Sequence, residues 1–159
     1  MRRYITALCV VGLMGAGAIA ASAAIPPTNK SFSGSGGNYE NQGGRWVRHG
    51  TRSFNFTTSK KYYYSVKKFR IYIKSFSSTY NTSCTGSHPI RASWILIHSD
   101  GSFNFAFVSH HAHVRIFGKF TGGGDSAQVN YVVNFSGSNT NPSGLISSCA
   151  TWVHGTAKH

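Results

Sequence analysis

The amino-acid sequence predicts an all-β protein: a single compact antiparallel β-sandwich or barrel of about seven to eight strands. Short stretches rich in Phe, Tyr, Ile and Val alternate between apolar and polar residues. Gly, Ser, Asn and Asp separate these stretches, as expected of turns. No helix of any length is indicated after residue 23. The domain expected over residues 44–159 is long enough to bury a core of its own.

The first 23 residues are typical of a signal peptide. Two arginines precede an apolar run, which ends in the small-residue cleavage pattern Ala21-Ser22-Ala23. We therefore expect the mature chain to begin at Ala24 and the protein to be secreted, either extracellular or associated with the cell envelope. An N-terminal membrane anchor is the alternative interpretation of this run.

The segment after the cleavage pattern shows no hydrophobic period. Residues 24–43 are dominated by Pro, Gly, Ser and Asn, so we expect a flexible leader, with Phe32 as the point where it would join the sheet. Two short strands are expected next, over 44–49 and 52–58.

The longest strand is expected over residues 61–76, where apolar and polar residues alternate. One face carries Phe69, Ile71 and Ile73. The other face carries Lys68, Arg70, Tyr72 and Lys74. This period of two predicts a half-buried antiparallel strand with a basic aromatic outer face.

A loop over 77–89 and five further strands complete the expected sheet. The Asp100-Gly101 pair predicts a tight hairpin turn between the first two of these strands. The strands are expected over 90–99, 102–108, 113–121, 127–135 and 145–157.

The charge of the chain indicates an affinity for polyanions. It has 16 Lys and Arg against 3 Asp and Glu, a formal net charge of +13. Such a charge attracts nucleic acid, anionic envelope polymers and lipid head groups. The alternative is that the charge supports solubility alone.

The few acidic residues disfavour catalysis by paired carboxylates. Glu40 falls in the expected leader, Asp100 in a hairpin turn and Asp125 in a Gly-rich turn, and each has a sufficient explanation as a turn residue. We therefore expect no enzymatic activity and no cofactor, with catalysis kept as the alternative.

Two cysteines, Cys84 and Cys149, remain after removal of the signal peptide. In an exported protein such a pair most simply forms one disulfide, and two free buried thiols are the alternative.

Three stretches together resemble a loose group of small secreted actinobacterial proteins of unknown function. They are "SDGSFNF" (99–105), "VRIFGKFT" (114–121) and "CATWVHGTAKH" (149–159). The resemblance covers roughly residues 45 to 159. It implies a secreted all-β domain with a Cys84–Cys149 bridge, and it implies no catalytic residues.

The stretch "VSHHAH" (108–113) raises the question of a metal site. The stretch contains three histidines, His110, His111 and His113. They lie either in the connection between two strands or on a continuous strand, and on a strand His111 and His113 would share a face. Zinc or copper usually needs three or four ligands, which this spacing alone does not supply. A secreted metal-binding or enzymatic domain that uses these histidines is the alternative function.

The function that the sequence favours is a non-catalytic, secreted domain that contacts an anionic envelope polymer or another polyanion. Cations neutralise phosphates and aromatic rings stack on bases or sugars, so a face with both suits such a ligand. The candidate residues are Lys61, Lys68, Arg70, Tyr72 and Lys74. The alternative is a solvated sheet face whose lysines discourage edge pairing.

Overall fold

The structure, a computed structural model, describes residues 24–135, 140–144 and 149–159. The expected signal peptide lies outside these residues. In the described part of the chain, regular structure consists of β-strands and three short 3₁₀ turns, so the all-β prediction is confirmed. No helix among the described residues has the length and hydropathy that crossing a membrane requires.

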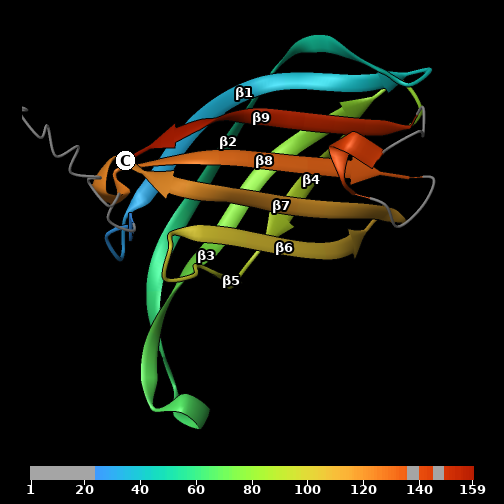
Figure 1. Cartoon of the computed structure of the whole chain (residues 1–159). Helices are drawn as coiled ribbons and strands as arrows, with labels where there is room; N and C mark the ends of the chain where they lie inside the picture. The colour runs from blue at the N-terminus through green and yellow to red at the C-terminus, as the bar shows by residue number, and fades with distance from the viewer. Residues whose placement is uncertain (1–23, 136–139, 145–148) are drawn as a thin grey trace, which may run out of the picture.

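The strands form one antiparallel sheet (Figure 1). They are β1 (Ser31–Gln42), β2 (Arg45–Tyr63), β3 (Lys68–Thr82), β4 (Gly86–Ala92), β5 (Ile95–Leu96), β6 (Ser102–Ser109), β7 (Ala112–Thr121), β8 (Ser126–Asn134) and β9 (Ala150–Lys158). The 3₁₀ turns are η1 (Tyr64–Val66), η2 (Gly122–Gly124) and η3 (Pro142–Gly144).

The sheet curls until its ends almost meet, which makes it a nearly closed barrel. Its order is β4-β3-β2-β1-β9-β8-β7-β6, and β5 pairs with β3 beside this path. Ile97 donates its backbone N–H to the Ile71 oxygen of β3 at 3.0 Å and forms a bridge with Phe103 of β6. The segment after β5 therefore links β3 to β6, the strand at the far end of the sheet.

The expectation of a flexible leader is wrong for residues 31–42, whereas the expected entry into the sheet at Phe32 is confirmed. Residues 31–42 form β1, which hydrogen-bonds to β2 on one side and to β9 on the other. Because β1 is rich in glycine, its sequence lacks the apolar–polar alternation that predicts a strand. The close packing of β1 against β9 nevertheless requires two of these glycines. A Cβ on Gly34 or Gly36 would lie 2.1 or 2.4 Å from a backbone oxygen of β9. Close backbone approach is one of the reasons for which strands carry glycine.

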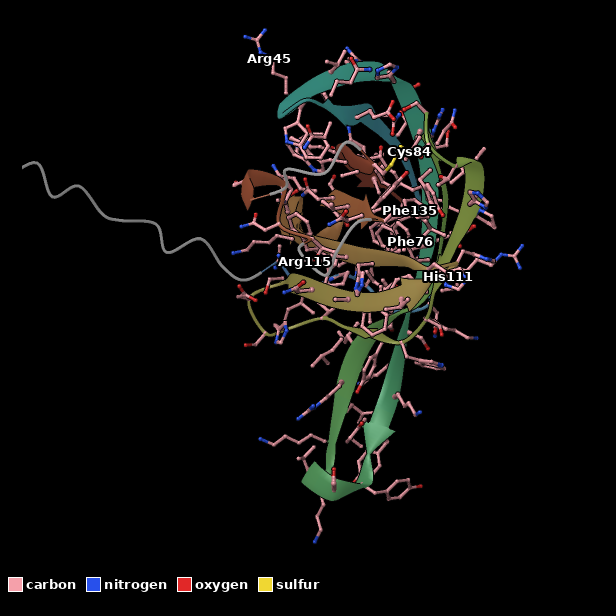
Figure 2. All side chains as sticks on the ribbon, turned by 90° about the vertical axis from the view of Figure 1, so that its right-hand side faces the viewer. Arg45, Phe76, Cys84, His111, Arg115 and Phe135 are labelled. Carbon is pink, nitrogen blue, oxygen red and sulfur yellow. A yellow bond between two sulfur atoms is a disulfide. The ribbon has the colours of Figure 1, made fainter. Side chains whose placement is uncertain are left out.

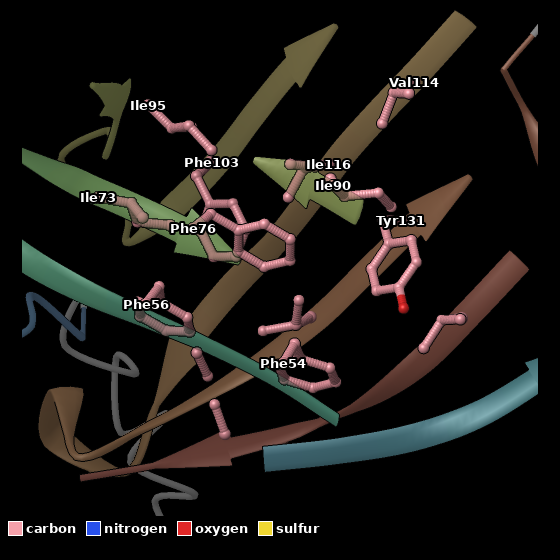
Figure 3. Close-up of a cluster of buried hydrophobic side chains, with 14 of the residues drawn as sticks. Phe54, Phe56, Ile73, Phe76, Ile90, Ile95, Phe103, Val114, Ile116 and Tyr131 are labelled. Atoms are coloured by element: carbon pink, nitrogen blue, oxygen red, sulfur yellow. The ribbon is translucent and has the colours of Figure 1, made fainter. Parts of the chain in front are cut away.

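The core fills the barrel with aromatic and β-branched side chains (Figure 3). Phe32 of β1 stacks on Phe56 of β2 with ring centroids 4.9 Å apart. Phe76 of β3 meets Tyr131 of β8 edge-on at 6.0 Å across the interior. The first contact joins neighbouring strands, whereas the second joins β3 to β8, which are distant in the sheet order. Contacts of the second kind keep the barrel curled.

The single strand expected over residues 61–76 is also a wrong prediction. The chain reverses at residues 64–67, between β2 and β3, where Lys67 adopts a left-handed conformation with φ 47°. A β-bulge follows at Lys74, which is paired with no residue of β2 because Thr57 pairs with Ser75 and Thr58 with Ile73. The bulge shifts the alternation by one residue, so the core side chain is Ile73 before it and Phe76 and Tyr80 after it.

Two other boundaries differ from the expected ones. The loop expected over 77–89 is short, because β3 continues to Thr82 and β4 begins at Gly86. The strand expected over 90–99 is divided by Trp94, which has φ 59°. The predicted turn at Asp100-Gly101 is present, with Gly101 at φ 81°.

Cys84 and Cys149 form a disulfide with their Cα atoms 5.8 Å apart. The bridge joins the loop after β3 to the residue before β9, and β2 and β1 separate these two strands in the sheet. It therefore ties two parts of the barrel that do not hydrogen-bond to each other as neighbours.

Candidate binding hairpin

The ends of β2 and β3 leave the barrel and form a projecting hairpin, residues 59–72 (Figures 1 and 2). Five cross-strand pairs build it, from Ser59 with Tyr72 to Tyr63 with Lys68. Beyond residue 58, β2 has β3 as its only strand partner, because its pairing with β1 ends at Thr57. The hairpin side chains from Lys60 to Phe69 are therefore exposed on both faces, whereas those of the barrel strands have an interior face.

One face of the hairpin alternates cations with aromatic rings. The Lys61 ammonium lies 4.8 Å from the ring centroid of Trp94, which follows β4. The Arg70 guanidinium lies 5.2 Å from the ring centroid of Tyr63. Lys68 is exposed on the same face.

The other face has the same composition. The Lys60 ammonium lies 4.5 Å from the ring centroid of Phe69, and Tyr62 meets Phe69 edge-on at 5.0 Å. Cations within this range of a ring are attracted by its π electrons, which holds the lysine over the ring and leaves its N–H groups free for a ligand.

The tip of the hairpin is apolar and uncovered. Tyr64 is 85% exposed and Val66 is exposed beside it. Tyr62 supports the Tyr64 ring edge-on at 5.0 Å. The tip thus presents a supported aromatic side chain and an aliphatic one to solvent.

The structure brings together three of the five residues predicted to contact a polyanion: Lys61, Lys68 and Arg70. Tyr72 lies on their face but is buried, with its ring edge-on to Trp94 at 6.1 Å. Lys74 is exposed at the bulge, at the base of the hairpin.

The sequence pattern missed the exposure of Phe69, which was expected to be buried. It is 60% exposed because the hairpin extends past the barrel, where no opposite wall covers its apolar face. A groove of about 610 Å³ at the hairpin base is lined in part by Phe69, Ile71, Ile25 and Leu96. Trp94 was also missed as part of the hairpin surface, since it reaches that surface from another segment.

The three histidines lie at and after the β6–β7 turn. His110 and His111 form a two-residue turn with φ 48° and 63°, which decides between the two geometries that the sequence allowed. His113 lies in β7, paired with Val108. Among the described residues, no group of three or more His, Cys, Asp or Glu side chains is arranged to hold a metal ion.

Two of the acidic residues lie at the surface, where Asp100 stabilises a turn and Asp125 contacts the C-terminal histidine. Asp100 accepts hydrogen bonds from the Ser102 backbone and hydroxyl at 3.0 and 2.6 Å. These bonds hold the pKa of Asp100 below its usual value, and the nearby Lys119 ammonium lowers it further. Asp125 lies 3.0 Å from the ring nitrogen of His159.

Glu40 is buried, in contrast to its expected place in a leader. One of its oxygens accepts hydrogen bonds from the Ser83 backbone and hydroxyl at 2.7 and 2.6 Å, and the other lies 3.8 Å from His49. A polar hollow of about 370 Å³ lies beside it. Glu40 thereby fixes the loop that contains Cys84 against β1.

No protein-family model, curated protein or solved structure matches this chain. The resemblance to secreted actinobacterial proteins therefore stays an expectation, and function has to be argued from the residues.

Proposed function

We propose that this protein is a secreted, non-catalytic domain that attaches to an anionic component of the cell envelope, or to another polyanion, through the projecting hairpin. The single observation that carries the proposal is the density of cations and rings on residues 59–72. This segment contains five Lys and Arg residues, and it also contains five exposed aromatic or aliphatic side chains.

The absence of neutralising acids supports this function. No acidic residue occurs between Glu40 and Asp100 in the sequence. Within the described part of the chain, no ion pair joins a hairpin cation to a carboxylate. The positive potential of the hairpin is therefore available to an external anion, and a protruding element reaches a surface before the rest of the molecule does.

The proposal of secretion has separate support. A disulfide and the lack of a membrane-spanning helix among the described residues are compatible with a location outside the cytoplasm. The interpretation of residues 1–23 as a signal peptide is part of the same proposal. The proposed absence of carboxylate catalysis is supported by the structural contacts of the three acids, Asp100 with a turn, Glu40 with a loop and Asp125 with the C-terminal His159.

The test is retention of the purified protein on immobilised poly(glycerol phosphate) across a salt series. We expect strong retention at low salt that falls steeply as salt rises. A variant with Lys61→Ser, Lys68→Ser and Arg70→Ser should lose most of it, with a log–log salt slope smaller by about two to three.

The matched control removes the same charge elsewhere. Arg45, Arg48 and Arg91 are exposed and lie outside the hairpin. Their joint change to Ser should leave most of the retention intact. Equal loss in both variants would mean that net charge alone attracts the polymer, and no retention of the wild type at low salt would sink the proposal.

A further inference from the structure

The exposed apolar side chains of the molecule are concentrated where its cations are. Of the nine large hydrophobic side chains that are exposed among the described residues, five lie on the hairpin and a sixth, Trp94, lies against it. The five are Tyr62, Tyr63, Tyr64, Val66 and Phe69. A soluble anionic polymer explains the cations, but it gains little from an uncovered aliphatic and aromatic tip.

We propose that the tip of the hairpin enters the interface of a bilayer that contains anionic lipid, an inference that rests on the proposed function and names its ligand. Tyrosine rings favour the headgroup level of a membrane, where the ring is half in hydrocarbon and the hydroxyl is in water. Val66 and Phe69 supply apolar surface beside these rings. Lys60, Lys61, Lys67, Lys68 and Arg70 surround this apolar surface at the level of the phosphates.

The length and architecture of the hairpin limit it to the interface. Five residue pairs span about 16 Å from the barrel to the turn, at about 3.3 Å per residue. Between Lys60 and Arg70, both hairpin strands have an edge with no further strand partner among the described residues. Exposed N–H and C=O groups are excluded from hydrocarbon. The tip therefore enters the boundary between headgroups and acyl chains, and the barrel stays outside the bilayer.

The hairpin is organised for this contact before any lipid is present. The edge-on contacts of Tyr62 with Tyr64 and with Phe69, both at 5.0 Å, fix the rings near the turn. The cation–ring contacts hold Lys60 and Arg70 beside the strands. Little side-chain ordering is left to accompany binding, which favours affinity. Each cation near an anionic surface then strengthens binding by about fivefold.

The test measures flotation of the purified protein with phosphatidylcholine vesicles, with and without phosphatidylglycerol. We expect binding only when phosphatidylglycerol is present. A variant with Tyr64→Ser and Val66→Ser should bind these vesicles about tenfold more weakly. It should keep its retention on poly(glycerol phosphate), because its cations are unchanged. The triple cation variant should lose both activities.

The matched control, Val47→Ser with Val108→Ser, removes two exposed apolar side chains away from the tip and should bind vesicles as the wild type does. Circular dichroism checks that each variant is folded. Unchanged vesicle binding in the tip variant, or no vesicle binding while the polymer is retained, would overturn bilayer entry and leave the polyanion proposal standing. If the wild-type protein binds neither the polymer nor the vesicles, the proposed function itself has failed.

Discussion

At the scale of single residues, the buried hydroxyl of Tyr131 shows how the interior handles a polar group. It donates to the Thr79 backbone oxygen at 2.8 Å and lies 2.8 Å from the Ser78 hydroxyl. Burial raises the pKa of Tyr131 to about 12, although the Ser78 hydrogen bond acts in the opposite direction. The ring thus stays neutral in the fold at a pH where an exposed tyrosine ionises.

This shift predicts a loss of stability at alkaline pH. Above about pH 10 the unfolded chain releases the Tyr131 proton while the folded chain retains it, so the free energy of unfolding falls by about 1.4 kcal/mol per pH unit up to about pH 12. Tyr131→Phe should be less stable at neutral pH by about 1–2 kcal/mol, because the Ser78 and Thr79 groups lose a partner. The free energy of unfolding of this variant should fall less steeply than that of the wild type as the pH rises above about 10. Denaturant unfolding at about pH 8 and about pH 11 measures both, and parallel losses in the two proteins would contradict the assignment.

At the scale of elements, the β6–β7 turn carries residues that its geometry disfavours. A two-residue hairpin turn with positive φ at both positions prefers Asn-Gly, and His110-His111 occupies it instead. Replacement by His110→Asn and His111→Gly should raise the free energy of unfolding by about 1 kcal/mol.

Thermal or denaturant unfolding checks this prediction, with His113→Asn as the control. His113 lies in extended β7, where Asn has no conformational advantage, so the control should show no gain. A loss of stability in the turn variant would mean that the histidine rings contribute contacts that outweigh their backbone strain. One such contact is that of His110 with His88, whose ring centroids are 5.9 Å apart.

At the scale of the whole molecule, the disulfide closes a loop that contains five of the nine strands of the described residues. Cys84 and Cys149 are 65 positions apart, and the loop that they close contains β4 to β8. The chain-entropy estimate for such a loop is on the order of 4 kcal/mol. Changing both cysteines to Ala should lower the free energy of unfolding by up to this amount.

Denaturant unfolding of the double variant gives the change, and reduction of the wild type should reproduce it. Retention on poly(glycerol phosphate) provides the control, because the bridge lies outside the hairpin and the folded variant should bind as the wild type does. An unchanged unfolding midpoint would show that the bridge adds no constraint to the unfolded chain.

The sequence by itself determined the class of the fold and its covalent framework. The recurrence of Phe at every second position, 103, 105 and 107, predicted β6, and Asp100-Gly101 predicted the turn before it. Such patterns are local, since the period of a strand and the φ of a turn depend on residues a few positions apart. The disulfide could also be predicted from the sequence, because two cysteines in an exported chain most simply form one disulfide.

Only the tertiary structure decided that the sheet curls into a barrel, that glycine-rich β1 lies in the middle of the sheet, and that β2 and β3 project beyond it. The reversal at residues 64–67 contains no glycine or proline, so local turn chemistry gave no sign of it. Phe69 was expected to be buried and is exposed, whereas Tyr72 was expected to be exposed and is buried. The reason for both differences is non-local. Trp94, from another segment, packs against Tyr72, whereas the ring contacts of Phe69 come from the hairpin's own Lys60 and Tyr62 and leave it 60% exposed. Burial depends on what lies opposite a side chain, and that partner comes from a distant part of the chain.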